Sequence, residues 1–320
     1  MKIFAAIDAG SNAVRMLVAA LDDEIHDEIH DEEIHEEGRL RRLRYERTTT
    51  RLAEGLAGGV GKDLSPRSME RTLHALKRYR RMLSSYRLSG LRAVGTSALR
   101  EAANAGSFVE RVLKETGIRL ETITHDEEAR LSAKGVMGFL DLPRAFILDI
   151  GGGSTEWMLT EDETLLRSGS VPVGVVKLAG KNKDAMQGEI GAAALRLKES
   201  VWPLPAGVSF VITGGTASTG ASIDLGLARY EHEKVHGHEI GFERLLEIYR
   251  LLASLPLEKR RRVAGLEPDR ADLIIPGLGL IIKIMGALGL NRVIASDTGL
   301  PEGLILELLE GNADGTDRPF

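Results

Sequence analysis

Two segments far apart in the chain hold residues suited to binding phosphate. Each has an apolar stretch that ends in an aspartate, Asp8 or Asp149, followed by a turn of small residues and a second apolar stretch. Glycine and serine allow a tight turn whose backbone amide groups can face an anion. The candidate phosphate-binding residues are Gly10, Ser11, Asn12 and Arg15 in the first segment, and Gly151, Gly152, Gly153, Ser154 and Thr155 in the second.

One glycine turn alone is weak evidence, because hairpins use glycine for reasons unrelated to ligands. Two similar segments in the two halves of the chain predict a duplicated domain, with the two turns facing each other across a cleft. A third candidate phosphate turn directly follows the apolar stretch 208–213 and consists of Gly214, Gly215 and Thr216.

Carboxylates beside these turns indicate a metal-assisted reaction on phosphate. Cleavage of a phosphoanhydride requires neutralised charge on the transferred group, positioning and an oriented water. Asp8, Asp149 and Glu156 could hold Mg²⁺, a hard cation that prefers oxygen ligands. A carboxylate at a strand end is costly to bury without a partner, which also favours a ligand there.

The surrounding stretches predict alternating strands and helices. Residues 65–82 begin with Ser65 as N-cap and Pro66 at the first helical position, and their apolar residues follow helical spacing. Further helices are expected at 107–115, 242–254, 272–288 and 301–310, with strands at 91–96 and 208–213. This alternation is typical of layered α/β domains.

Length and composition limit the classes of protein to consider. A chain of 320 residues with 43% hydrophobic content exceeds what one core usually organises, so two domains are expected. The chain has no cysteine, which excludes disulfides and thiolate chemistry. Its net charge of -5 argues against a nucleic acid polymer as partner. Neither a signal peptide nor a membrane span is expected, which favours a cytoplasmic protein.

Local charge clusters allow sharper interpretations. The run 22–37 is rich in His, Asp and Glu, and His26 and His30 stand one helical turn apart, so a metal site there is conceivable. A solvent-facing extension between two strands is favoured instead. Basic clusters at 39–47, 77–81 and 259–262 are either solvated faces or a path for a phosphate polymer. A metal site at His232, His236 and His238 is rejected in favour of ordinary hydrogen bonding.

Several runs together resemble the exopolyphosphatase and guanosine pentaphosphate phosphohydrolase (Ppx/GppA) phosphatase family, in order and in spacing. These runs are 8–15, 95–100 with Asn104, 126–131, 148–156, 214–219, 235–238 and 270–277. Two departures stand out: Thr124 and His125 replace the family's usual serine and glycine, and Pro301 replaces an arginine. The length corresponds to the short, two-domain form of the family.

The resemblance implies an actin-like and sugar-kinase-like fold with two duplicated ribonuclease-H-like α/β domains and substrate in the interdomain cleft. The expected domains are 1–125 and 126–300, with the helix and tail at 301–320 packing back on the first. In the family pattern Glu128 would activate water, Asp149 and Glu156 would organise the metal and the attacked phosphate, Asp8 would assist, and Arg100 would bind phosphate. These assignments agree with the chemistry of carboxylates and arginine forks.

The leading interpretation is an exopolyphosphatase that releases terminal orthophosphate from polyphosphate with Mg²⁺ or another divalent cation. A guanosine pentaphosphate hydrolase with the same centre is a close alternative. A small-molecule kinase of the same superfold and a non-catalytic nucleotide-binding regulator are the remaining hypotheses, and the acids at 126–128 argue against the kinase. A homodimer is left open.

Overall fold

The computed structural model describes residues 1–21, 40–56 and 62–313. The run 22–37, with His26 and His30, therefore lies outside the described residues. The chain forms two compact units, which we call unit 1 (Met1–Asp141 with Leu300–Phe320) and unit 2 (Leu142–Gly299). Unit 1 runs on to Asp141 rather than ending at residue 125, and it includes the C-terminal helix.

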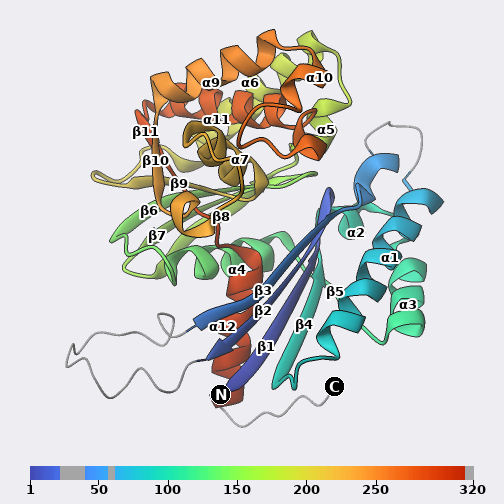
Figure 1. Ribbon diagram of the computed structural model, residues 1–320. Helices are drawn as coiled ribbons and strands as arrows, with labels where there is room; N and C mark the ends of the chain where they lie inside the picture. Colours follow the sequence, from blue (N-terminus) through green and yellow to red (C-terminus); the bar gives the residue numbers. More distant parts are fainter. Residues whose placement is uncertain (22–39, 57–61, 314–320) are drawn as a thin grey trace. The chain divides into compact units, whose positions relative to one another are not determined.

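Unit 1 is built on a five-stranded sheet in the order β3-β2-β1-β4-β5 (Figure 1). The first three strands are antiparallel, whereas β4 and β5 run parallel to β1. The strands are β1 (Lys2–Ala9), β2 (Ala13–Leu21), β3 (Leu40–Thr49), β4 (Gly90–Gly95) and β5 (Leu120–Thr122). The helical elements are η2 (Leu52–Gly55), α1 (Pro66–Leu83), α2 (Ser97–Glu101), α3 (Ala105–Thr116), α4 (His125–Met137) and α12 (Leu300–Ala313).

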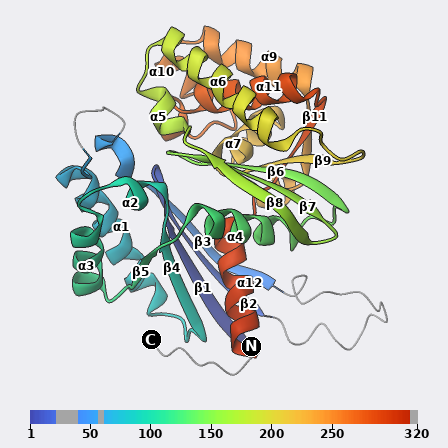
Figure 2. The ribbon, with the colours of Figure 1, turned by 180° about the vertical axis from the view of Figure 1, so that it is seen from behind.

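The alternating side chains of β1 divide the core of unit 1 between two faces. Ala5 and Ile7 pack with residues of α1 and α3, such as Leu73 and Phe108. Phe4 and Ala6 pack instead with Leu131 of α4 and with Leu300, Leu304 and Ile305 of α12. Because successive residues of a strand point to opposite faces, a strand this apolar must be covered on both. Helix α12 therefore completes one face of the unit 1 sheet (Figure 2).

Unit 2 is built on a six-stranded sheet in the order β10-β11-β9-β6-β7-β8. Phe146, Leu148 and Ile150 of its central strand share a core with Ile190 and Leu280 from two long helices. The strands are β6 (Arg144–Ile150), β7 (Thr155–Glu161), β8 (Thr164–Val171), β9 (Ser209–Thr213), β10 (His238–Gly241) and β11 (Arg292–Ala295). The helical elements are α5 (Val175–Ala179), α6 (Lys183–Val201), α7 (Gly215–Asp224), α8 (His232–Val235), α9 (Phe242–Ser254), α10 (Leu257–Arg260), η3 (Pro268–Arg270) and α11 (Ile274–Leu288).

The two sheets repeat one topology. In unit 2, β6, β7 and β8 are antiparallel neighbours, while β9 pairs parallel with β6 and β11 pairs parallel with β9. This is the order and direction of β1, β2, β3, β4 and β5, with β10 added at one edge. The expectation of a duplicated ribonuclease-H-like α/β fold is confirmed. Among the described residues, no helix is long and apolar enough to cross a membrane.

Candidate functional site

The two predicted phosphate turns have the same backbone geometry. The amide of Gly10 donates to the carbonyl of Ala13 at 3.0 Å, and the amide of Gly151 donates to the carbonyl of Ser154 at 3.0 Å. Each turn connects the first two strands of its sheet. The resemblance between the two segments therefore reflects equivalent hairpins of the duplicated fold.

The carbonyl groups of each turn accept hydrogen bonds from a neighbouring segment. In unit 1 the amide of Ala53 donates to Ser11 at 3.0 Å, and those of Thr50 and Arg51 donate to Asn12 at 3.0 and 2.8 Å. In unit 2 the first amides of α5 do the same, because Val175 donates to Gly151 at 3.0 Å and Val176 to Gly152 at 2.9 Å. The carbonyls are thus turned into the protein.

The amides of the turns are left for a ligand. Within the described ranges, the amides of Ser11, Asn12, Gly152 and Gly153 donate to no acceptor of the chain. Successive amides with no protein partner form a concave site that favours an anion. The second turn also needs glycine at position 174, where a Cβ would lie 2.4 Å from the backbone of Gly152.

The residues that face each other across the two hairpins differ in charge. Asp8 is the register partner of Arg15, and Oδ2 of Asp8 lies 2.7 Å from Nε and 2.5 Å from Nη2 of Arg15. At the equivalent place in unit 2, Asp149 is the register partner of Glu156. Unit 1 therefore holds a paired anion and cation, whereas unit 2 holds two carboxylates.

Two carboxylates at this place are chemically suited to hold a cation. Asp149 and Glu156 are 6% and 1% exposed, and Oε1 of Glu156 accepts a hydrogen bond from Ser170 at 3.0 Å. Like charges directly opposite each other on neighbouring strands are destabilising, and burial in a poorly solvated site increases that cost. A divalent cation would offset both charges, and carboxylate oxygens are the ligands that Mg²⁺ prefers.

The first turn carries buried polar atoms that the protein does not satisfy. In the described part of the chain, Oδ1 of Asp8, Oγ of Ser11 and Oδ1 of Asn12 have no hydrogen-bond partner. Buried polar atoms are rarely left unpaired, so each needs a water, an ion or a ligand. Three such atoms at one turn support a ligand-binding role for it.

At the third turn, the side chain of Arg270 from η3 lies over the start of α7. Gly214 caps α7 with φ 87, and a Cβ there would lie 3.2 Å from Oδ1 of Asp149. A Cβ on Gly215 would lie 1.5 Å from Nη1 of Arg270, so the guanidinium lies directly over this glycine. The N-terminus of a helix attracts anions, and Arg270 lies beside it while its Nε pairs with Glu267 at 3.0 Å.

Two predicted phosphate residues have their side chains engaged in packing. Oγ1 of Thr155 donates to the carbonyl of Val173 at 2.7 Å, and Thr155 is fully buried. The side chain of Thr216 lies against Gly277 of α11, where a Cβ would approach it to 2.6 Å. Both side chains therefore contact other parts of unit 2.

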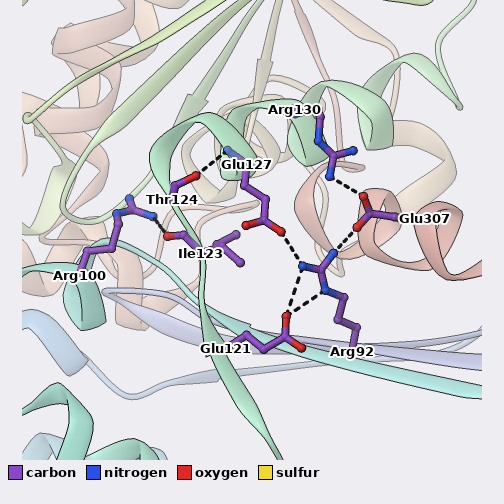
Figure 3. Close-up of polar contacts among 8 residues, drawn as sticks. All are labelled: Arg92, Arg100, Glu121, Ile123, Thr124, Glu127, Arg130 and Glu307. Atoms are coloured by element: carbon purple, nitrogen blue, oxygen red, sulfur yellow. Dashed lines mark hydrogen bonds and ion pairs between the residues drawn. The ribbon is translucent and has the colours of Figure 1, made fainter. Parts of the chain in front are cut away.

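Glu128 and Arg100 form an ion pair in unit 1. Oε2 of Glu128 lies 2.6 Å from Nη1 of Arg100, and both side chains are mostly buried. Nη1 of Arg100 also donates to the carbonyl of Ile123 at 2.9 Å (Figure 3). The residue predicted to act on water thus contacts the residue predicted to bind phosphate. Thr124 caps α4, since its Oγ1 accepts from the amide of Glu127 at 3.1 Å, so this departure from the family pattern still starts the helix.

A charged cluster around Arg92 holds α4 on the sheet (Figure 3). Arg92 of β4 pairs with Glu121 of β5 at 3.3 Å, with Glu127 of α4 at 2.5 Å, and with Glu307 of α12. Glu307 also pairs with Arg130 of α4. Burial alone would lower the pKa of Arg92, but the hydrogen bond to Glu127 and the charges of Glu307 and Glu121 raise it above its usual value.

Sequence reasoning did not identify several residues that support the candidate site. Ser170, the Arg92 cluster and the position of Arg270 over Gly215 depend on strand register or on contacts between distant segments. The three histidines near residue 236 make hydrogen bonds to aspartates: His238 binds Asp224 at 2.7 Å, His232 binds Asp297 at 2.6 Å, and Nδ1 of His236 accepts from the amide of Asp297 at 3.3 Å. Over the described residues they do not gather as ligands of one ion.

Comparison with known proteins gives consistent results. The model of the Ppx/GppA phosphatase family matches residues 33–312. The chain is 28% identical to exopolyphosphatase 2 of Mycobacterium tuberculosis, covering 95% of this chain and 98% of that protein. It is 27% identical to a bifunctional 3-dehydroquinate synthase/phosphatase of Fusobacterium nucleatum, covering 96% of this chain but only 46% of that protein. The crystal structure of the Aquifex aeolicus Ppx/GppA family member matches with a TM-score of 0.77 and 27% identity, covering 97% of this chain and 99% of that one.

Proposed function

Because the chain belongs to the Ppx/GppA phosphatase family, we propose that it is an exopolyphosphatase that releases orthophosphate from the end of polyphosphate. The family makes the chain a phosphoanhydride hydrolase, the class expected from the sequence. The choice of polyphosphate is supported by the Mycobacterium tuberculosis relative, which is named an exopolyphosphatase and matches over nearly its whole length.

The facing carboxylates Asp149 and Glu156 are the observation that carries this proposal. They stand beside a turn whose amides are open to an anion, and they replace the neutral Asp8–Arg15 pair of the equivalent hairpin. Carboxylates would repel a polyphosphate on their own. A divalent cation between carboxylates and phosphate reverses that repulsion, which is how phosphoryl transfer sites commonly work.

We propose Mg²⁺ as the cation, with Asp149 and Glu156 as its ligands and Asp8 as a third carboxylate. The chemistry of Asp149 and Glu156 in unit 2 fits this ion, because carboxylate oxygens are hard ligands. Bound there, Mg²⁺ would neutralise charge on the phosphate oxygens.

The other residues bind the substrate and move a proton. The amides of the turns at 10–12 and 151–154 hold phosphate oxygens, and Arg15, Arg100 and the turn at 214–216 add further contacts. The carboxylate of Glu128 accepts a proton from a water as that water attacks the terminal phosphorus. The bond to the bridging oxygen breaks, and the shortened chain leaves with the electron pair. Arg100 keeps Glu128 in place while it does so.

Guanosine pentaphosphate is the second candidate substrate, since the family name covers both activities. Phosphate release from long polyphosphate, tripolyphosphate, guanosine pentaphosphate and ATP, each with Mg²⁺, tests the proposal. We expect polyphosphate to give the highest kcat/KM. The proposal would be overturned if the wild-type protein released phosphate from none of the four substrates and so did not differ from Glu128→Gln.

A further inference from the structure

The outer face of helix α6, in the helix layer of unit 2 (Figure 2), carries an exposed stripe with two large apolar side chains. Leu195 is 60% exposed, and Trp202, which directly follows the helix, is 54% exposed. Ile190 and Leu197 on the opposite face pack into the core of unit 2. Exposed positions spaced three and four residues apart lie on one face of a helix. We call this series the α6 stripe, and its members are Ala185, Gly188, Ala192, Leu195, Glu199 and Trp202.

Two glycines of α6 are not required by the packing of unit 2. A Cβ at Gly188 would meet no atom within 4 Å, and a Cβ at Gly191 would meet only Cε of Lys283 at 4.0 Å, the backbone of α6 itself apart. Glycine inside a helix is less favourable than alanine, so an open place for a Cβ is a cost without a return inside the unit. A second helix packed on this face would use the glycines, because helix axes approach to about 8 Å only where the side chains at the contact are small.

The α6 stripe is complementary to an antiparallel copy of itself. When two identical helices run in opposite directions, each pair of facing residues occurs twice, once on each side of a two-fold axis. The register that sets Ala192 opposite Leu195 of a second copy also sets Ala185 opposite Trp202 of that copy. Each large side chain then faces a small one, as interdigitated helix packing requires.

Glu199 is the one charged member of the stripe, and it selects this register. It lies opposite Gly188 of the second copy, where the missing side chain leaves the carboxylate a way to solvent. A shift by one heptad in one direction sets Glu199 against Leu195, and a shift in the other direction moves Trp202 beyond the end of the contact. A single polar residue in an apolar helix seam commonly fixes register in this way.

Charges that flank the stripe are complementary in the same register. Glu189 and Arg196 of a second copy lie on the same side of the seam, offset by about 3 Å along the helix axis. Within the described residues, Arg196 has no ion-pair partner, and Glu189 shares an exposed ion pair with Lys181 at 2.9 Å. Two-fold symmetry forms the contact between Glu189 and Arg196 twice. The charges therefore favour a second copy of this chain as the occupant.

We propose that the α6 stripe is a homodimer contact, in which two copies of the protein pack their α6 helices antiparallel. The surface contains none of the residues assigned above to phosphate or metal, so the inference does not depend on the substrate. The contact uses one helix from each copy and is smaller than a standard interface. We therefore expect a dissociation constant no tighter than about 1 µM.

Sedimentation velocity over a range of protein concentrations from about 1 to 200 µM tests the proposal. We expect the dimer fraction of wild-type protein to rise with concentration. Leu195→Glu should weaken association at least about tenfold, because each copy would then bury a new charge against Ala192 of the other. Leu251→Glu is the matched control, since Leu251 is 54% exposed on α9 of the same unit, and it should associate like wild type. Melting temperatures verify that both variants are folded.

Charge reversal tests the antiparallel arrangement itself. Arg196→Glu sets two glutamates beside each other across the contact, and Glu189→Arg sets two arginines there. Each variant alone should associate about tenfold more weakly than wild type, whereas an equimolar mixture of the two should regain wild-type association. Residues 189 and 196 of different copies meet in this way only when the helices run antiparallel in the proposed register.

Tryptophan emission gives a local measurement of the same contact. Trp157 is 6% exposed, so a blue shift that grows with protein concentration reports burial of Trp202. Wild-type protein that stays monomeric over the whole range would overturn the proposal. A dimer that Leu195→Glu leaves unchanged would do the same, since association would then use another surface. A mixture of the charge variants that associates no better than its parts would exclude the antiparallel contact.

Discussion

Arg92 on strand β4 lies 2.5 Å from Glu127, the residue directly before Glu128 in helix α4. Glu127, which belongs to a structural ion pair, and Glu128, the proposed general base, are thus consecutive residues at the start of helix α4. The same arginine pairs with Glu307 of α12, so the position of α4 depends on two other elements of unit 1.

Arg92→Met should therefore lower both stability and turnover. The change leaves Glu121, Glu127 and Glu307 near one another without their shared cation, and we expect a loss of about 2 kcal/mol in the free energy of unfolding. We expect kcat to fall more than KM rises, because α4 moves Glu128. Arg144→Met removes an exposed ion pair in unit 2 and should cost well under 1 kcal/mol. Urea unfolding and steady-state phosphate release measure both effects, and similar results for the two variants would contradict the role of Arg92.

Glu128→Gln should abolish most of the turnover without unfolding the protein. Glutamine keeps the shape of the side chain but cannot take a proton, so we expect kcat to fall roughly 10² or more. Glu110→Gln, on the exposed face of α3, is the matched control and should change neither kcat nor KM. Turnover near the wild-type value in Glu128→Gln would show that another group activates the water.

Asp149→Asn should remove most of the effect of Mg²⁺ on the stability of the protein. In EDTA the variant should melt at the wild-type temperature or above it, because the substitution relieves repulsion with Glu156. Wild-type protein should gain about 2–3 kcal/mol of stability when Mg²⁺ exceeds its dissociation constant a hundredfold, and the variant should gain much less. Differential scanning calorimetry with and without Mg²⁺ distinguishes the two. An equal gain in both proteins would remove Asp149 from the metal site.

Gly215→Ala should weaken phosphate binding while preserving the fold. The new Cβ would collide with the guanidinium of Arg270, which can swing away because it is the end of a flexible side chain. Loss of a charged contact to phosphate should raise KM for polyphosphate roughly tenfold. Gly220→Ala lies further along the same helix, where a Cβ would meet only Leu278 at 3.5 Å, and it should stabilise the protein by up to about 1 kcal/mol. Unchanged KM in Gly215→Ala would exclude Arg270 from the phosphate site.

Unit 2 should lose stability in acid through Asp224. Burial by itself would raise the pKa of Asp224, but hydrogen bonds from Arg244 and His238 outweigh it and hold that pKa below its usual value. A lowered pKa stabilises the fold above the unfolded value, near 4, and this contribution disappears as pH falls through the folded value. Melting temperatures measured from neutral pH down to about pH 3 should therefore fall less steeply for Asp224→Asn than for wild type. Parallel curves would contradict this.

Local signals in the sequence predicted much of the fold. Ser65 and Pro66 start α1 as expected, and helix 242–254 has the expected ends, because capping and apolar spacing act over a few residues. Helix α6 was missed, since two of its five buried positions are alanines, which contribute little to an apolar periodicity. The aspartates and glycines of the two hairpins identified the duplication.

The pairing of site residues could not be predicted in the same way. That Asp8 faces Arg15 while Asp149 faces Glu156 follows from strand register, which a single sequence does not specify. The Arg92 cluster needs Glu307, which is distant in sequence and arrives through α12. In the described part of the basic cluster, Arg42 pairs with Glu302 and Arg44 with Glu46, contacts that a single sequence does not specify.

Because α12 belongs to unit 1, the two units complete their folding in a fixed order during synthesis on the ribosome. Unit 2 is one continuous stretch, so it can fold as soon as residue 299 has left the exit tunnel. The sheet that contains β1 must wait, because Phe4 and Ala6 are covered by Leu304 and Ile305, which are synthesised later. The amino-terminal strands therefore spend most of translation with the part of one apolar face that α12 covers open to solvent and to chaperones. Vectorial synthesis completes the second unit of this protein before the first.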